Sequence, residues 1–141
     1  MIQFQLVSSA GSKYSDQAYE VIVPTRGGML SIFEDHMPLV AAARAGVLSV
    51  RKKANDPDSD LEQFAINGGL VEVQGKNVHF VADDVTTADE VSEQEASEAL
   101  KRAEELVKSA DSQTALHEAH RLLHHSSAKL HLAQLKKRHH R

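Results

Sequence analysis

Residues 24–50 read PTRGGMLSIFEDHMPLVAAARAGVLSV, a stretch in which short apolar runs alternate with turn-forming residues. Gly27 and Gly28 tolerate positive φ, and Pro38 fixes φ and removes a backbone donor. Apolar segments divided in this way predict β-strands that turn sharply, as in a sandwich or barrel. The stretch contains no nucleophile, phosphate-loop or metal-ligand signature, so its residues alone indicate a binding surface on a β-rich unit.

Further strands are predicted on both sides of this stretch. Apolar and polar residues alternate in residues 2–6 and again in residues 20–23, which follow a polar loop from Gly11 to Asp16. Two more pairs of strands flank a polar loop at residues 53–58 and a tight turn at Gly75. Roughly eight to ten short strands at close spacing are typical of an antiparallel β-sandwich.

The composition of the chain changes near residue 85. Every glycine, proline and aromatic residue lies before this point, and the rest is rich in Ala, Glu, Leu, Lys and His. Helix-start signals occur at Thr87 with Glu90 and at Ser92 with Glu95, and a break with a new cap follows at 111–112. We therefore expect an α+β protein, with an N-terminal antiparallel β-sandwich in residues 1–85 and a C-terminal α-helical hairpin in residues 86–141.

The two predicted helices carry opposite charge. Residues 89–111 contain eight acidic and three basic residues, whereas residues 112–141 contain one acidic and six basic residues. The helices therefore attract each other, but their apolar seam is rich in alanine, which buries little area. The second helix also has two apolar stripes, one for its neighbour and one for another surface. We expect the hairpin to be mobile; the alternative is an ordinary docked hairpin.

Composition excludes several classes of protein. A net charge of −4 gives no field that would attract nucleic acid or an anionic membrane. The chain has no cysteine, and it shows no signal peptide and no apolar run of the ~20 residues that span a bilayer. These features predict a soluble, cytoplasmic protein that does not bind nucleic acid.

Seven of the nine histidines follow residue 116. His117, His120 and His124 fall on one helical face, where neutral imidazoles are able to ligate zinc. No cysteine or carboxylate completes such a site, so we expect a solvated face and no bound metal. Acidification should add positive charge to this helix and strengthen its attraction to acidic surfaces.

Two blocks of sequence resemble the epsilon subunit of bacterial F-type ATP synthase. The first block matches the family pattern at Gly28, Ile32, Phe33, His36, Pro38, Leu39, Gly46, Leu48 and Val50. The second matches at Asn67-Gly68-Gly69-Leu70-Val71-Glu72-Val73, Asn77-Val78 and Val81-Ala82-Asp83. Their order and spacing, in a chain of the family's usual length, identify the chain as a member of this family.

The resemblance implies a non-catalytic rotor subunit that couples proton flow to ATP synthesis. Its sandwich would sit on the central stalk and bind the gamma subunit and the top of the c-ring, peripheral to the cytoplasmic face of the bacterial cell membrane. The residues that correspond to this contact are Gly28, Met29, Ser31, Glu34 and His36. Met29 replaces an acidic residue of the family pattern, Ser31 replaces a glycine, and Glu34 begins the pair that replaces Pro-Gly.

The resemblance also implies a role for the helices. The hairpin would fold against the sandwich or extend along the stalk, where it blocks ATP hydrolysis. In the extended state a basic second helix would contact an acidic segment of the catalytic beta subunit through Lys129, Lys136, Lys137 and Arg138. The simpler interpretation is that these cations complement the C-terminal end of a helix.

Some members of the family bind ATP through a motif at the start of the first helix. The matching residues here are 91–96, where Ser92 replaces the Asp and Glu95 occupies the position of the Arg. A carboxylate at that position would repel phosphate, so we expect weak or absent nucleotide binding and no cofactor.

Two further functions remain open. One is an unrelated β-sandwich interaction module with a mobile helical arm. A test of binding to gamma would distinguish this module from an epsilon subunit. The other is a small metal-dependent enzyme that uses the histidine cluster, although no nucleophile–base pair accompanies the cluster. A zinc titration would test the metal-dependent enzyme.

Overall fold

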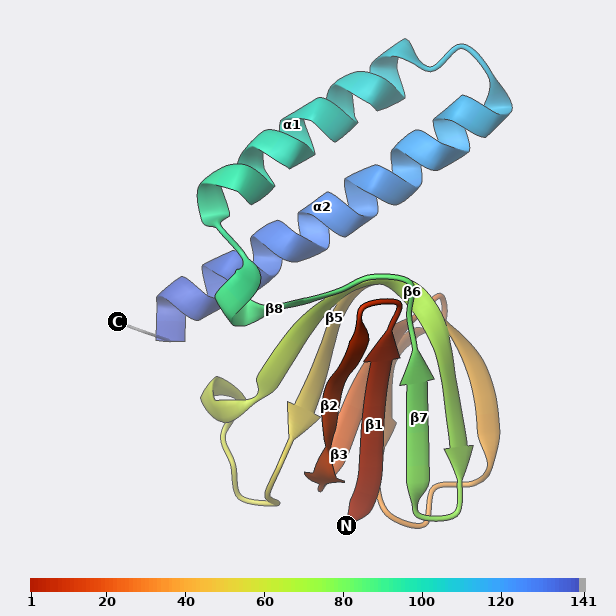
Figure 1. Ribbon diagram of the computed structural model, residues 1–141, viewed down its shortest axis with the longest axis vertical. Helices are drawn as coiled ribbons and strands as arrows, with labels where there is room; N and C mark the ends of the chain where they lie inside the picture. The colour runs from red at the N-terminus through yellow and green to blue at the C-terminus, as the bar shows by residue number, and fades with distance from the viewer. Residues whose placement is uncertain (140–141) are drawn as a thin grey trace.

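The computed structural model describes residues 1–139, which form a folded β-sheet followed by two long helices (Figure 1). The strands are β1 (Ile2–Ser8), β2 (Gly11–Ala18), β3 (Glu20–Thr25), β4 (Gly28–Ile32), β5 (Leu39–Arg51), β6 (Glu62–Gln74), β7 (Asn77–Val81) and β8 (Val85–Thr87). The helices are α1 (Glu93–Ser109) and α2 (Gln113–His139), and two 3₁₀ turns are η1 (Asp58–Asp60) and η2 (Ala88–Glu90).

The eight strands form one sheet in the order β2-β1-β7-β6-β5-β3-β4, and β8 pairs with β6. All neighbouring strands are antiparallel except β1 and β7, which run parallel. The sheet folds over on itself (Figure 1). Buried apolar side chains of its strands form one core cluster. The predicted N-terminal β-sandwich is confirmed.

The core of the sandwich follows from the alternation seen in the sequence. In β1 the buried positions are every second residue, and β7 repeats the pattern. The largest side chains that are fully buried in the sandwich are Ile2, Phe4, Leu6, Val21, Val23, Ile32, Leu48, Val50, Phe64, Ile66 and Phe80. Each such side chain contributes about 1.5–3 kcal/mol through burial, so this part of the chain has its own core.

The polar stretch predicted as a loop from Gly11 to Asp16 is strand β2, and the prediction was wrong. β2 lies at an edge of the sheet and pairs with β1 alone. Of its residues only Tyr14 and Ala18 are buried. An edge strand with one exposed face needs few apolar residues, so its sequence carries little strand signal.

Two other connections lie where the sequence predicts them. β5 and β6 pair along their length and are joined by the polar segment that contains residues 53–58. β6 and β7 form a tight hairpin in which Gln74 pairs with Asn77 around Gly75. Gly75 has a φ of 61°, a left-handed conformation that favours glycine.

The two C-terminal helices form an antiparallel hairpin, as predicted. The Ser92 side chain accepts a hydrogen bond from the Glu95 amide at 3.4 Å, and Ser112 accepts one from the Ala115 amide at 3.1 Å. These serines satisfy amide groups that the first turn of each helix leaves free. No helix in the described range 1–139 is long and apolar enough to cross a membrane.

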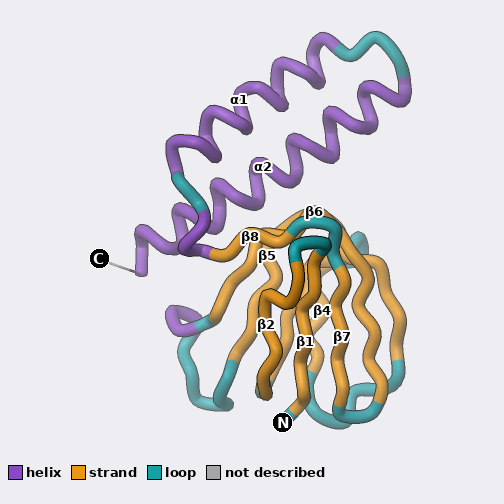
Figure 2. Tube along the Cα trace, in the orientation of Figure 1, coloured by secondary structure: helices purple, strands orange, loops and turns teal. Residues whose placement is uncertain are grey.

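Helix α2 lies between α1 and the sandwich (Figure 2). Its Leu132, which is only 1% exposed, and Ala128 pack on Ala65 of β6. In α1 the buried residues are two alanines, Ala96 and Ala103. The hairpin therefore docks on the sheet through one small apolar cluster, and its internal seam is poor in large side chains.

Candidate functional site

The turn between β4 and β5 carries two of the residues predicted to contact a partner. The Glu34 carboxylate lies 2.5 Å from the N-terminal ammonium of Met1 and 3.3 Å from Lys76 Nζ. Hydrogen bonds from these two cations lower the pKa of Glu34. His36 Nδ1 donates to the main-chain carbonyl of the next residue at 2.8 Å. This turn lies with the N-terminus, at the end of the sandwich away from the helices (Figure 1).

Gly28 and Met29 begin β4, and the strand separates them from Glu34 and His36, whereas Ser31 is its second-last residue and lies nearer the turn. Gly28 follows the β3–β4 turn with a φ of 120°. Met29 is 55% exposed and lines a cavity of about 280 Å³ together with residues of α2. Because β4 rises about 3.3 Å per residue, the five residues do not form one compact site. They occupy the helix-facing end and the opposite end of the sandwich.

An exposed apolar row crosses the outer face of three strands. Ala42 of β5 pairs with Leu70 of β6, which pairs in turn with Val81 of β7. Leu70 and Val81 are 49% and 58% exposed, and Val40, two residues before Ala42, is 63% exposed. Apolar patches of this kind are typical of protein-contact surfaces. Sequence reasoning missed the row. The available signal was the alternation in β7, in which Val78 and Phe80 are buried and the next residue, Val81, faces solvent.

The basic residues of α2 contact carboxylates of the same chain. Three of the four residues predicted to act on a partner form ion pairs of 3.5–3.9 Å: Lys129 with Asp84, Lys136 with Asp89, and Lys137 with Glu93. The fourth, Arg138, is exposed. The acceptors lie before β8, in η2 and at the start of α1, so the basic end of α2 is held against the junction between sandwich and helices.

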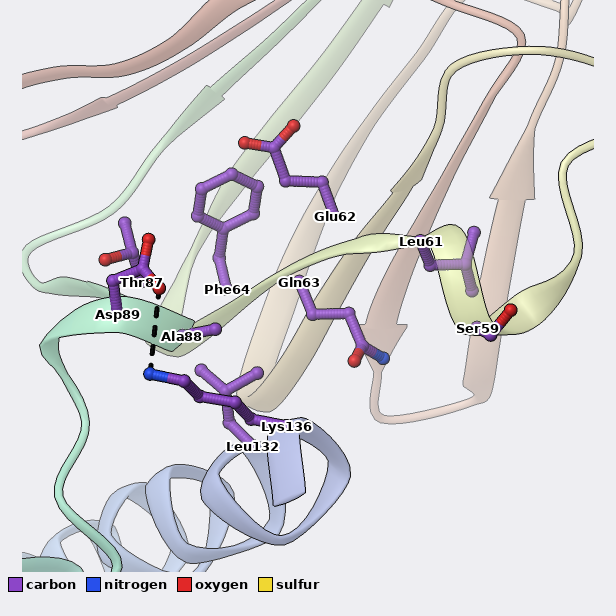
Figure 3. A pocket seen from close by; sticks show the side chains of 10 residues that line it. All are labelled: Ser59, Leu61, Glu62, Gln63, Phe64, Thr87, Ala88, Asp89, Leu132 and Lys136. Carbon is purple, nitrogen blue, oxygen red and sulfur yellow. Dashed lines mark ion pairs between the residues drawn. The ribbon is translucent and has the colours of Figure 1, made fainter. Parts of the chain in front are cut away.

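A cavity of about 290 Å³ lies beneath this basic end (Figure 3). Its walls come from β6, η2 and α2, through residues that include Phe64, Ala88 and Leu132. The ion pair between Lys136 and Asp89 spans its edge (Figure 3). The basic end of α2 and the sandwich thus share the walls of one pocket.

His125 is a buried polar residue in the interface between α2 and the sandwich. Its side chain is only 9% exposed, and Nε2 lies 2.9 Å from Asp84 Oδ2. Nδ1 is buried without a hydrogen-bond partner in the described residues. Burial and the nearby Lys129 ammonium lower the pKa of His125, and Asp84 opposes them. Sequence reasoning did not single out His125, although it shares the i, i+3, i+7 spacing with Ala128 and Leu132.

The three histidines predicted to share a helical face do so, and the rings of His120 and His124 stack with centroids 6.4 Å apart. Together with His117 they line a cleft between α2 and the sandwich. In residues 1–139 no group of three His, Cys, Asp or Glu side chains is arranged to hold a metal ion. The absence of a bound metal at these histidines stays a prediction.

The residues of the degenerate nucleotide motif lie at the start of α1. Ser92 is the N-cap, and Glu95 is exposed in the first helical turn. An acidic side chain at this position stabilises the helix by complementing its dipole. Weak or absent nucleotide binding at residues 91–96 stays a prediction.

Comparison with known proteins identifies relatives of both parts of the chain. The profile of the family described as ATP synthase, Delta/Epsilon chain, beta-sandwich domain matches residues 1–88. The ATP synthase epsilon chain of Neisseria meningitidis serogroup C is 36% identical over 131 residues, which cover 92% of this chain and 91% of that protein. The ATP synthase epsilon chain of Staphylococcus aureus (strain JH9) is 31% identical over 136 residues, which cover 96% of this chain and 98% of that protein.

Solved structures share the fold at lower sequence identity. A chain in the Euglena gracilis mitochondrial ATP synthase structure of OSCP, F1 and c-ring aligns with a TM-score of 0.76 and 16% identity, covering 90% of this chain and 78% of that one. A chain from the central stalk and c-ring of the Tetrahymena thermophila mitochondrial ATP synthase aligns with a TM-score of 0.59 and 17% identity, covering 97% and 95%. Both alignments extend over the sandwich and the helices.

Proposed function

We propose a function from the premise that this chain belongs to the family of ATP synthase epsilon chains. It is a non-catalytic subunit of the central stalk in a proton-translocating F-type ATP synthase. It couples proton flow to ATP synthesis, and its C-terminal helices restrain ATP hydrolysis. The complex holds it at the cytoplasmic face of the bacterial membrane, as a peripheral subunit.

In this proposal the sandwich is the part that binds the rotor. The apolar row of Ala42, Leu70 and Val81 offers a flat hydrophobic surface for the gamma subunit. The turn that carries Glu34 and His36 is exposed at one end of the sandwich and offers polar contacts to the top of the c-ring. Gly28 and Met29 lie at the other end of β4, whereas Ser31 lies near the turn, so the two groups of residues would meet different parts of the complex.

The restraint on hydrolysis depends on the basic end of α2. The observation that carries this proposal is the pairing of Lys129, Lys136 and Lys137 with carboxylates of the same chain. These ion pairs are partly exposed, so each contributes at most about 1 kcal/mol. An acidic segment of the catalytic beta subunit would offer the same lysines equivalent partners. Exchanging these ion pairs for equivalent ones on a partner would therefore cost little free energy, and the main cost of release would be the exposure of Leu132.

The experiment that tests the proposal measures ATP hydrolysis by an epsilon-free catalytic head from the same organism. The full chain and a form that ends at Thr87 are titrated separately into the assay. We expect both forms to co-elute with the head through gamma, and only the full chain to inhibit. The shorter form retains the buried core of the sandwich, so it is a suitable control.

Other results would revise the proposal in different ways. Equal inhibition by both forms would move the restraint to the sandwich. Co-elution without inhibition by either form would leave coupling as the function. Failure of both forms to co-elute with the head would contradict the rotor assignment and favour an unrelated interaction module.

A further inference from the structure

A cationic cleft lies between the first half of α2 and the sandwich, on the side of α2 that faces away from α1. Its volume is about 490 Å³. The charged and titratable side chains that line it are Arg26, Arg44, His117, His120, Arg121 and His124. We call this group the cationic cleft.

The concentration of positive charge in the cleft is local. The whole chain has 20 acidic and 16 basic residues and a net charge of −4. Among the described residues that line the cleft, none carries a carboxylate. Like charges at close range repel one another, and a counter-charge inside the cleft would relieve that repulsion.

The cleft draws its cations from three elements. Arg26 lies in the turn between β3 and β4, and Arg44 lies on β5. Arg44 is held in place, because its Nε donates to the Thr25 carbonyl at 3.0 Å and its Nη1 to the Ala45 carbonyl at 3.3 Å. The guanidinium keeps further N–H donors for a ligand. Arg121 and the histidines come from α2, so the cleft exists only when the hairpin lies on the sandwich.

We propose that the cationic cleft is a binding site for a small anion that carries more than one phosphate group. Planar guanidinium groups form paired hydrogen bonds with phosphate oxygens, and imidazole supplies further donors. The cleft is large enough for a ligand bigger than a single ion. None of residues 91–96 lines it, so the site is separate from the degenerate nucleotide motif.

The test is isothermal titration calorimetry of the full chain with inorganic pyrophosphate at low ionic strength and neutral pH. We expect saturable binding with one pyrophosphate per chain. Arg26→Gln and Arg121→Gln should each weaken the affinity about tenfold, the effect of losing one charge-assisted hydrogen bond. Arg102→Gln on α1 is the matched control, because it removes the same charge away from the cleft and should leave the affinity within about twofold.

Arg44→Gln is a less informative variant, because Arg44 also bonds to the backbone of the sandwich. Circular dichroism of the other two variants establishes that they remain folded. An absence of saturable heat with the unmodified chain at millimolar pyrophosphate would overturn the proposal. Equal weakening by Arg102→Gln would also overturn it, because the binding would then be non-specific attraction.

A second arm distinguishes a free anion from a lipid headgroup. The full chain is sedimented with phosphatidylglycerol vesicles and, as a control, with phosphatidylcholine vesicles. Pyrophosphate binding without sedimentation supports a free ligand, whereas sedimentation that pyrophosphate reverses supports a headgroup in the same cleft. Sedimentation that Arg26→Gln leaves unchanged would contradict the cleft as the site. Both arms use the chain without the rest of an ATP synthase, so their outcome is independent of the proposed rotor role.

Discussion

At the scale of single residues, Gly69 is the glycine with the least room for a side chain. Its φ is 148°, and an added Cβ would lie 2.5 Å from the Val81 carbonyl oxygen and 2.6 Å from the Phe80 ring. Both neighbours are fixed, one as backbone and the other as a fully buried ring. We expect Gly69→Ala to lower the free energy of unfolding by about 3 kcal/mol, measured by urea denaturation.

Gly27→Ala is the matched control for this prediction. An added Cβ at Gly27 meets only Thr25 Oγ1, at 3.9 Å, and the residue is outside the left-handed region. Its effect should therefore stay within about 0.5 kcal/mol. Similar losses for the two variants would mean that the close approach of β7 to Gly69 does not limit stability.

His125 makes the docking of α2 sensitive to pH. Burial and Lys129 lower its pKa below 6.5 in the docked state, and Asp84 only partly opposes them. The docked state therefore binds fewer protons than a released helix, in which His125 would be solvated. Docking is strongest above pH 6.5 and weakens as the pH falls below it, toward the lowered pKa.

NMR titration of the imidazole resonances tests this prediction. The pKa of His125 in the full chain should be lower than in a peptide of residues 113–139. His125→Gln should reduce the pH dependence of docking, measured by hydrogen exchange of α2 after correction for intrinsic exchange rates. A pKa in the full chain that equals or exceeds the value in the peptide would contradict the argument.

At the scale of elements, α2 depends on Leu132 for its contact with the sheet. Leu132 is 1% exposed and packs with Ala128 on Ala65. We expect Leu132→Ala to weaken docking of the hairpin by about 2–4 kcal/mol while the sandwich stays folded, because its core does not include Leu132. The measurement is hydrogen exchange, which should accelerate in α2 and remain slow in β1 and β7.

Leu122→Ala provides the control on the same helix. Leu122 is 42% exposed, so removing its side chain should change docking by less than about 0.5 kcal/mol. Acceleration of exchange in β1 or β7 by Leu132→Ala would show that the hairpin and the sandwich unfold as one unit.

The elements that sequence predicted well are those with strong local patterns. The alternation in β1, the turn at Gly75 and the serine caps at Ser92 and Ser112 are each set by neighbouring residues. β2 was missed because an edge strand takes its structure from its partner more than from its own side chains. The parallel pairing of β1 with β7 was equally unpredictable, because it joins segments about 70 residues apart.

At the scale of the whole molecule, the candidate surfaces depend on how the two parts meet. Residue types in α2 indicated a basic helix, but not that Lys136 and Lys137 would pair with Asp89 and Glu93. Sequence likewise gave no means of placing Arg26 of the β3–β4 turn beside the histidines of α2. Such juxtapositions arise from tertiary packing, so the surfaces between the parts were beyond prediction from local patterns.

The proposed restraint on hydrolysis makes Leu132 and the lysines act in opposite directions. Releasing α2 from the sandwich favours the extended state, so Leu132→Ala should lower the concentration of chain that half-inhibits the epsilon-free head, by about tenfold for 1.4 kcal/mol of lost docking. Lys136→Gln combined with Lys137→Gln also weakens docking, but it removes the charges that would meet the acidic partner. This double variant should therefore inhibit less strongly than the unmodified chain. If both variants inhibited more strongly, the lysines would serve only to hold the hairpin closed, and the contact with the beta subunit would have to lie elsewhere on α2.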